Sequence, residues 1–177
     1  TIERVCRGLD VDPTTDSIAH CMTHHLNEPY DLKEILRYSV GEILTNVAQH
    51  SGGEGFICAQ RYKHSNMIHV AVSDNGIGLQ RSFEGTSLES ELSTPLLALE
   101  KAMEPEVSGA LLRPLSGPDQ EYVNRGIGLS MVNELIRQTY GRMRIITENA
   151  VFTRTGDVEA RFDETDELHC PGVTVEL

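Results

Sequence analysis

Two glycine-containing segments have compositions that could hold a ligand close to the backbone. Gly126 and Gly128 precede a predicted helix, whose free N-terminal amides and dipole favour a phosphate group. Asp74 directly follows a predicted strand, and Gly76 and Gly78 after it permit positive φ angles and a close approach to a ligand. Neither segment has the third glycine of a dinucleotide-binding turn. The alternative to ligand binding is a tight turn at residues 74–78 and, at residues 126–128, glycines that allow the helix to pack closely.

A third group of polar residues lies between them and the N-terminus. Glu42, Asn46 and His50 follow one another at intervals of four residues. In a helix, each such step turns the chain by about 40° beyond a full turn, so the three side chains share one edge. The competing interpretation is that they are exposed polar residues at the flank of an amphipathic helix.

Hydrophobic periodicity indicates the helices and strands that carry these residues. The first helix begins at Asp31, with Glu34 completing a capping-box pattern, and ends at residues 51–53. Its apolar residues keep a helical period for over four turns and are Leu32, Ile35, Leu36, Val40, Ile43, Leu44 and Val47. Strands at residues 56–62 and 67–73 then form a hairpin, which leaves Asp74 at a strand end.

The rest of the chain predicts one layered domain. Residues 12–16 read as a polar loop, and residues 80–125 as a long lid with a short helix near 96–103. A second helix follows Gly126 and stops at Gly141. Strands at 143–147, 150–153 and 172–177 surround an acidic loose turn at 157–167. This order predicts an α+β fold, a two-layer α/β sandwich with helices on one face of a mixed sheet.

Composition excludes several classes of protein. The formal net charge is −12, which argues against nucleic acid as a partner because phosphate-backbone binding needs a basic surface. No apolar run approaches the roughly 18 residues of a membrane span. The cysteines Cys6, Cys21, Cys58 and Cys170 are scattered and are interpreted as free thiols, so we expect a cytoplasmic protein.

The three groups taken together resemble the GHKL superfamily of ATP-binding domains, named for gyrase, the heat-shock chaperone, histidine kinases and MutL. The segment GEILTNVAQHS looks like the N box of this family, SDNGIGL its first glycine box and NRGIGLSMVNEL its second. The resemblance covers residues 31–177, with the lid at about 80–125. We interpret residues 1–30 as an N-terminal segment, such as the end of an upstream domain.

The resemblance implies a role for each motif residue. Asp74 would accept a hydrogen bond from the adenine amino group, Asn46 would bind Mg²⁺, and Glu42 would orient a water or another nucleophile as the catalytic residue. The remaining residues would contact ATP at its base, ribose or phosphates, namely His50, Gly76, Gly78, Arg125, Gly126, Gly128, Leu129 and Thr174. Cofactors would be ATP and Mg²⁺.

The sequence departs from histidine kinases at three places. Gly41 precedes the N-box glutamate where a His or Arg is usual, and Gln49 replaces a Lys that would contact phosphate. Gly172 is followed by Val173, so the usual Gly-Thr pair of the last strand is interrupted and Thr174 comes one position late.

Three functions follow from the resemblance. The first is the Mg-ATP-binding catalytic domain of a signalling protein kinase, like a histidine kinase or an anti-sigma serine kinase, which passes the γ-phosphoryl group to another domain or protein. The second is an ATP hydrolase that drives a conformational switch, and the third is a nucleotide-binding regulatory module without turnover. We expect a protein phosphoacceptor or regulatory partner, and a dimer contact through a region outside this sequence.

Overall fold

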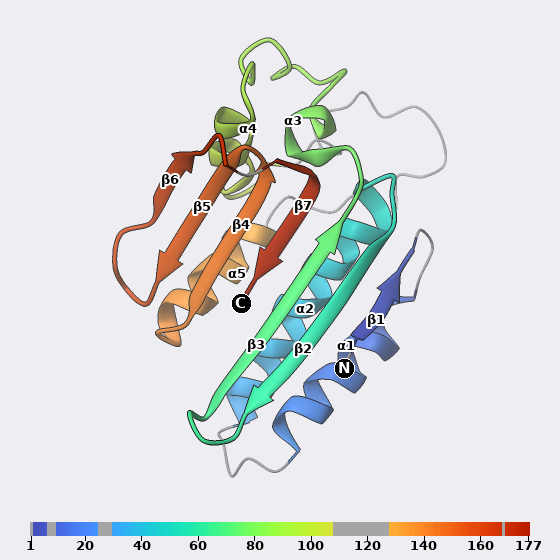
Figure 1. Ribbon diagram of the computed structural model, residues 1–177, viewed down its shortest axis with the longest axis vertical. Coiled ribbons are helices and arrows are strands. Elements are labelled where there is room, and N and C mark those ends of the chain that lie inside the picture. Colours follow the sequence, from blue (N-terminus) through green and yellow to red (C-terminus); the bar gives the residue numbers. More distant parts are fainter. Residues whose placement is uncertain (1, 7–9, 25–29, 108–127, 168) are drawn as a thin grey trace.

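The computed structural model describes residues 2–6, 10–24, 30–107, 128–167 and 169–177. Helices cover one face of a seven-stranded sheet, and the two-layer α+β architecture is thereby confirmed (Figure 1). The strands are β1 (Ile2–Val5), β2 (Gly55–Tyr62), β3 (Met67–Asp74), β4 (Arg142–Glu148), β5 (Ala150–Thr155), β6 (Arg161–Glu164) and β7 (Cys170–Glu176).

The strand order along the sheet is β1-β2-β3-β7-β4-β5-β6. Every neighbouring pair of these described strands is antiparallel, where we expected mixed directions. The C-terminal strand β7 is inserted between β3 and β4, with Val72 opposite Val175 and Ser73 opposite Thr174. This insertion brings the end of the chain beside the segment that carries Asp74.

The described helices are α1 (Val11–Thr23), α2 (Tyr30–His50), α3 (Gly78–Ser82), α4 (Pro95–Ala102) and α5 (Gly128–Gln138). In Figure 1, α2 and α5 lie behind the sheet, α1 lies beside β1 and β2, and α3 and α4 lie at the end where β3 stops. Among these helices, none combines the length and the apolar character needed to cross a membrane.

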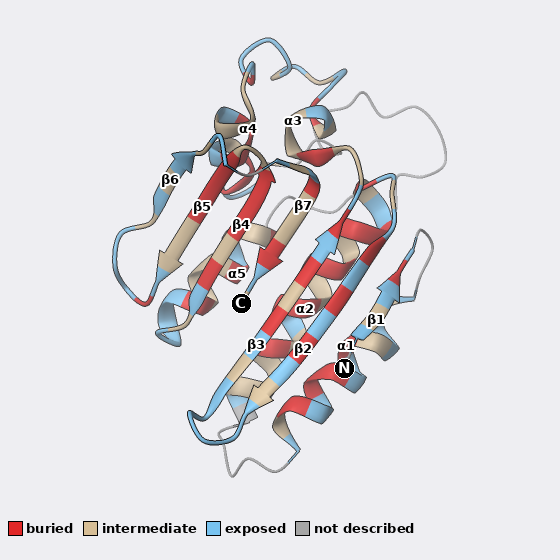
Figure 2. Ribbon diagram, viewed as in Figure 1, coloured by how far each residue is buried: buried red, intermediate tan, exposed pale blue. Residues whose placement is uncertain are grey.

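The core lies between the sheet and α2 and α5, where buried residues gather (Figure 2). Buried and exposed residues alternate along β2 from Gly55 to Gln60, because successive side chains of a strand point to opposite faces. On α2 the core residues Val40, Ile43, Leu44 and Val47 keep the helical spacing. The predicted helix and hairpin are therefore confirmed, although α2 begins at Tyr30 instead of Asp31.

Residues 12–16 form the first turns of α1, so the expected polar loop there is wrong. The carboxylate of Asp10 caps this helix by accepting a hydrogen bond from the backbone N–H of Asp12 (3.3 Å). The buried residues of α1 have the spacing of an amphipathic helix and are Thr15, Ile18, Ala19 and Met22. Because two of the four are polar or small, their apolar period is weak in the sequence.

Part of the expected lid is regular structure. α3 and α4 share a small hydrophobic cluster built on Phe83, Leu92, Ala98 and Ala102, which also contacts Leu129 of α5. The prediction of a short helix is confirmed by α4, whereas α3 was not expected. The lid residues 108–125 lie outside the described residues.

The acidic stretch at residues 157–167 contains strand β6, so the expected loose turn is corrected. β6 pairs with β5, and Phe162 packs against Phe152 with 5.0 Å between ring centroids. Phe162 alone among acidic neighbours does not produce the alternating pattern that predicts a strand. The segment is stabilised instead by its pairing with β5, which is already part of the sheet.

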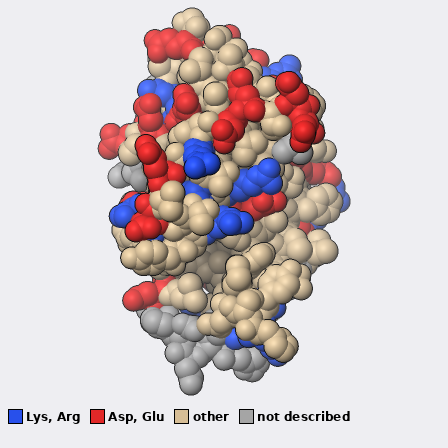
Figure 3. All heavy atoms as spheres, turned by 60° about the vertical axis from the view of Figure 1, so that its left-hand side comes forward, with Lys and Arg blue, Asp and Glu red and all other residues tan. Residues whose placement is uncertain are grey.

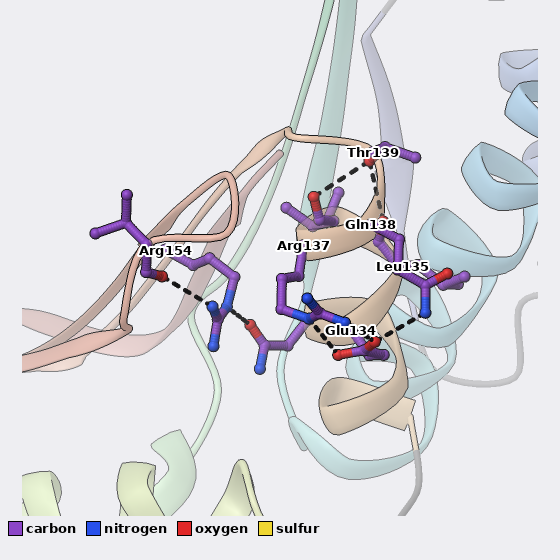
Figure 4. A network of polar contacts seen from close by, with 9 residues as sticks. Glu134, Leu135, Arg137, Gln138, Thr139 and Arg154 are labelled. Carbon is purple, nitrogen blue, oxygen red and sulfur yellow. Dashed lines mark hydrogen bonds and ion pairs between the residues drawn. The ribbon is translucent and has the colours of Figure 1, made fainter.

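Polar contacts run along α5, and one of them joins this helix to β5 (Figure 4). Glu134 accepts hydrogen bonds from Arg137 and Gln138, which lower the pKa of its carboxyl to about 2. Arg154 of β5 donates to the side chain of Asn133 on α5 and to the carbonyl of Val158 (3.0 Å). The contact between Asn133 and Arg154 joins α5 to the sheet, although the two residues are 21 positions apart in the sequence.

Candidate functional site

A cavity opens where β3 ends, and it is lined by five different parts of the fold. Its walls are mainly apolar, with Ile43 and Val47 from α2, Val173 and Val175 from β7, and Leu129 from α5. Phe83, Ala102 and Val107 contribute further apolar surface from the α3–α4 region. No sequence motif points to these last three residues, because their approach depends on how α3 and α4 fold back over the sheet.

Asp74 is the one carboxylate among the described residues that line this cavity. It is the last residue of β3 and only 8% exposed. Its Oδ1 accepts a hydrogen bond from the N–H of Gly76 (2.8 Å), and its Oδ2 accepts one from the N–H of Val173 (3.3 Å). Burial raises the pKa of the Asp74 carboxyl, and the two hydrogen bonds oppose that shift. The side chain is thus held in one orientation at the cavity wall.

Gly172 lies directly against Asp74. A Cβ atom at this position would be 2.3 Å from the carbonyl oxygen of Asp74 and 2.4 Å from its Oδ1. No larger residue fits unless β7 moves away from β3. In the sequence Gly172 stands out only as part of a departure from the family pattern, and the β3–β7 pairing shows why a glycine is needed there.

The two glycines of the first box have different surroundings. Gly78 lines the cavity, and its φ of 74° is a conformation that L-residues rarely adopt. Gly76 is not among the lining residues. A Cβ atom there would be 2.1 Å from the carbonyl oxygen of Ser51, so Gly76 allows the turn to pack against the end of α2.

The polar residues of α2 divide between two places. Asn46 and His50 line the cavity, and both are half-buried. Glu42 is not among the lining residues, and its carboxylate lies against Gly128, the first residue of α5. Burial raises the pKa of the Glu42 carboxyl, and the hydrogen bond from Tyr38 opposes this effect.

The start of α5 contributes Gly128 and Leu129, two residues of the second glycine box, to the cavity wall. Arg125 and Gly126 lie outside the described residues. Thr174 is not brought into the cavity. Adjacent residues of β7 face opposite sides of the sheet, and Val173 and Val175 face the cavity. Thr174 therefore faces the other side, where its hydroxyl lies 2.7 Å from that of Ser73.

A family model described as histidine kinase-, DNA gyrase B-, and HSP90-like ATPase matches residues 32–166, which is most of the chain. The chain belongs to this family. It is a GHKL-type ATP-binding domain, and the resemblance drawn from its three motifs is confirmed. Comparisons with curated proteins and with solved structures found no match.

The residues of this GHKL-type domain fit an adenine nucleotide and its metal. An apolar cavity with one buried acceptor suits a planar base that carries an amino group. The described residues contain no group of three or more His, Cys, Asp or Glu side chains that could hold a metal. Asn46 contributes to the cavity wall a carboxamide, whose oxygen is a type of ligand that Mg²⁺ accepts beside phosphate oxygens.

Proposed function

We propose that this domain binds Mg-ATP and acts as the catalytic domain of a signalling protein kinase, which transfers the γ-phosphoryl group to another domain or protein. The observation that supports nucleotide binding most directly is the buried, doubly hydrogen-bonded carboxylate of Asp74 in an otherwise apolar cavity. An acceptor fixed in this way can select an amino group on a base, since its orientation needs no adjustment when the base enters.

The roles of the other residues follow from their places. Asn46 would hold Mg²⁺ through its amide oxygen, and His50 would contact the ribose or the phosphates. The backbone N–H groups at the start of α5 would bind the phosphates, as a helix N-terminus favours anions. When bound, Mg²⁺ would screen the negative charge of the phosphates, which the net charge of −12 on this chain otherwise opposes.

Glu42 would act on the nucleophile of the acceptor. Its carboxylate would orient the attacking group and take up the proton that this group loses as its bond to the γ-phosphorus forms, while the bond from that phosphorus to the β,γ-bridging oxygen breaks and ADP leaves. A half-buried carboxylate with a raised pKa is a stronger base than an exposed one, which suits this task.

An ATP hydrolase is the second candidate, and the same position of Glu42 favours it. With water as the nucleophile, the proposed base would produce free phosphate without any partner. The contact of the α3–α4 cluster with Leu129 would then connect the cavity to a conformational switch.

The two candidates are separated by following γ-labelled ATP. A kinase transfers the label to its acceptor domain or partner and releases little phosphate when the purified chain is alone. A hydrolase releases phosphate alone, and Glu42→Gln abolishes the release whereas Glu34→Gln on the same helix does not. If the chain neither transfers the label nor releases phosphate, but Mg-ATP still stabilises it against unfolding, the protein is a regulatory nucleotide-binding module. That result would contradict both the kinase and the hydrolase proposal.

A further inference from the structure

The carboxylate of Glu42 is enclosed by two residues that no motif assigns to it. Tyr38 precedes Glu42 by one helical turn on α2, and the hydrogen bond between its hydroxyl group and the carboxylate opposes the rise in the pKa of Glu42 that burial causes. Residues four apart on a helix face the same side, so this bond needs no distortion of the backbone. Among the described groups, burial and this hydrogen bond are the influences that act on the pKa of Glu42.

Gly128 lies directly against the carboxylate. A Cβ atom at Gly128 would be 2.3 Å from Oε2 of Glu42 and 3.3 Å from its Cδ. The φ angle of Gly128 is not in the left-handed region, so the backbone itself would accept alanine. The absence of a side chain at the start of α5 is therefore explained by the space that the carboxylate of Glu42 occupies.

We propose that Tyr38 and Gly128 are positioning residues that together hold the Glu42 carboxylate at the junction of α2 and α5. The inference rests on the proposed function for its consequence in turnover, but the arrangement itself exists without nucleotide. Tyr38 fixes the direction of the carboxylate, and Gly128 provides the space into which it fits. The position of Glu42 consequently depends on α5 being docked against α2, and α5 begins in the second glycine box.

The first test measures the titration of Glu42 by NMR of its isotopically labelled carboxyl carbon, in nucleotide-free and metal-free protein. Tyr38→Phe removes the hydrogen bond that stabilises the carboxylate, so the pKa of Glu42 should rise. Gly128→Ala forces the carboxylate out of its space toward solvent, so the pKa should fall. Opposite shifts distinguish two specific contacts from a general loosening of the fold, which would move both variants in the same direction.

Matched controls are available on α2 and just after the end of α5. Gly41→Ala introduces a methyl group on α2 that meets only ordinary contacts with Thr15, the closer at 3.7 Å. Tyr140→Phe removes the hydroxyl of a tyrosine that is 75% exposed. Both controls should leave the titration of Glu42 unchanged. An unchanged titration in Tyr38→Phe, or in Gly128→Ala, would overturn the inference.

The second test measures turnover in the full-length protein with its acceptor. Tyr38→Phe and Gly128→Ala should each lower kcat about tenfold, because a misplaced base loses part of its contribution. In Tyr38→Phe the KM for ATP should stay within about twofold, since Tyr38 is not among the cavity-lining residues. If calorimetry shows that the wild-type chain does not bind Mg-ATP, the proposed function fails while the titration result still decides the positioning role.

Discussion

At the scale of single residues, the site depends on how Asp74 is buried without being lost as an acceptor. Its carboxylate is almost completely enclosed, yet each oxygen receives one backbone N–H. A buried carboxylate without such partners would be expected to take up a proton near neutral pH. The two N–H groups come from residues on different segments, Gly76 in the following turn and Val173 on β7, so the chemistry of Asp74 requires both segments in place.

Replacing this acceptor tests its role in binding. Asp74→Asn should weaken Mg-ATP binding by about 1.5–3 kcal/mol, the range for a hydrogen bond to a charged group. Isothermal titration calorimetry measures the change, and Asp157→Asn, at an exposed aspartate, is the control. Wild-type affinity in a folded Asp74→Asn protein would remove Asp74 from the base-binding role.

The affinity for nucleotide should also depend on pH through Asp74. Burial raises its folded-state pKa above the ordinary value of 3.8, so the carboxyl becomes protonated at a higher pH than an exposed aspartate. The acceptor is then present above this raised pKa and is lost as the pH falls through it. Calorimetry at decreasing pH should show a loss of affinity for Mg-ATP that is absent in Asp74→Asn. The titration of ATP itself affects both proteins equally and cancels in the comparison. Parallel pH profiles of affinity for the two proteins would contradict the prediction.

At the scale of elements, the end of α5 shows how a helix can stop without its usual residue. The N–H of Gly141 donates to the carbonyl of Ile136 (2.9 Å), and that of Tyr140 to the carbonyl of Arg137 (3.2 Å). This is the Schellman pattern, in which glycine usually occupies the left-handed position. Here Tyr140 occupies it with φ at 55°, one residue before the glycine that we expected to stop the helix. The tyrosine is 75% exposed, so packing does little to offset the strain.

Substituting this residue should stabilise the protein. Tyr140→Gly relieves the left-handed strain and should raise the free energy of unfolding by about 1 kcal/mol. Tyr140→Ala is the matched control, because it removes the ring but keeps the Cβ atom that causes the strain. Urea unfolding monitored by circular dichroism measures both, and equal stabilities of the two variants would show that the backbone conformation is not the cause.

At the scale of the whole molecule, the acidic balance has to coexist with binding of an anion. Acidic and basic side chains are interspersed on the face shown in Figure 3, and no broad basic area marks that face. The formal net charge of −12 therefore acts against nucleotide at long range. In the function we propose, attraction would be local and would come from Mg²⁺, from the amides at the start of α5 and from the apolar walls around the base.

Binding across so many elements should stabilise the entire fold. The cavity joins α2, β3, β7, α5 and the α3–α4 region, which unfolding would separate. Free Mg-ATP at about 100 times its dissociation constant should raise the free energy of unfolding by about 2.7 kcal/mol. Thermal unfolding with and without ligand measures this effect, with Asp74→Asn at the same ligand concentration as the weaker-binding control. No shift of the wild-type transition at high Mg-ATP would contradict nucleotide binding.

Local patterns in the sequence were sufficient for the central helix, the β2–β3 hairpin and the placement of Asp74 at a strand end. Each of these follows from a hydrophobic period or a turn within a short segment. The apolar residues that form the period are the residues that the fold buries. The family motifs belong to the same category, since their residues lie next to one another in the chain.

The surroundings of those motifs are set by contacts between segments that lie far apart in the chain. Val173 reaches Asp74 across 99 positions of sequence, Gly172 fits behind it, and Thr174 turns to the other face, all because β7 pairs with β3 in one register. The contact between Glu42 and Gly128 likewise requires α2 and α5 to pack side by side. Such approaches depend on long-range pairing and close packing, for which no local period in a sequence carries information.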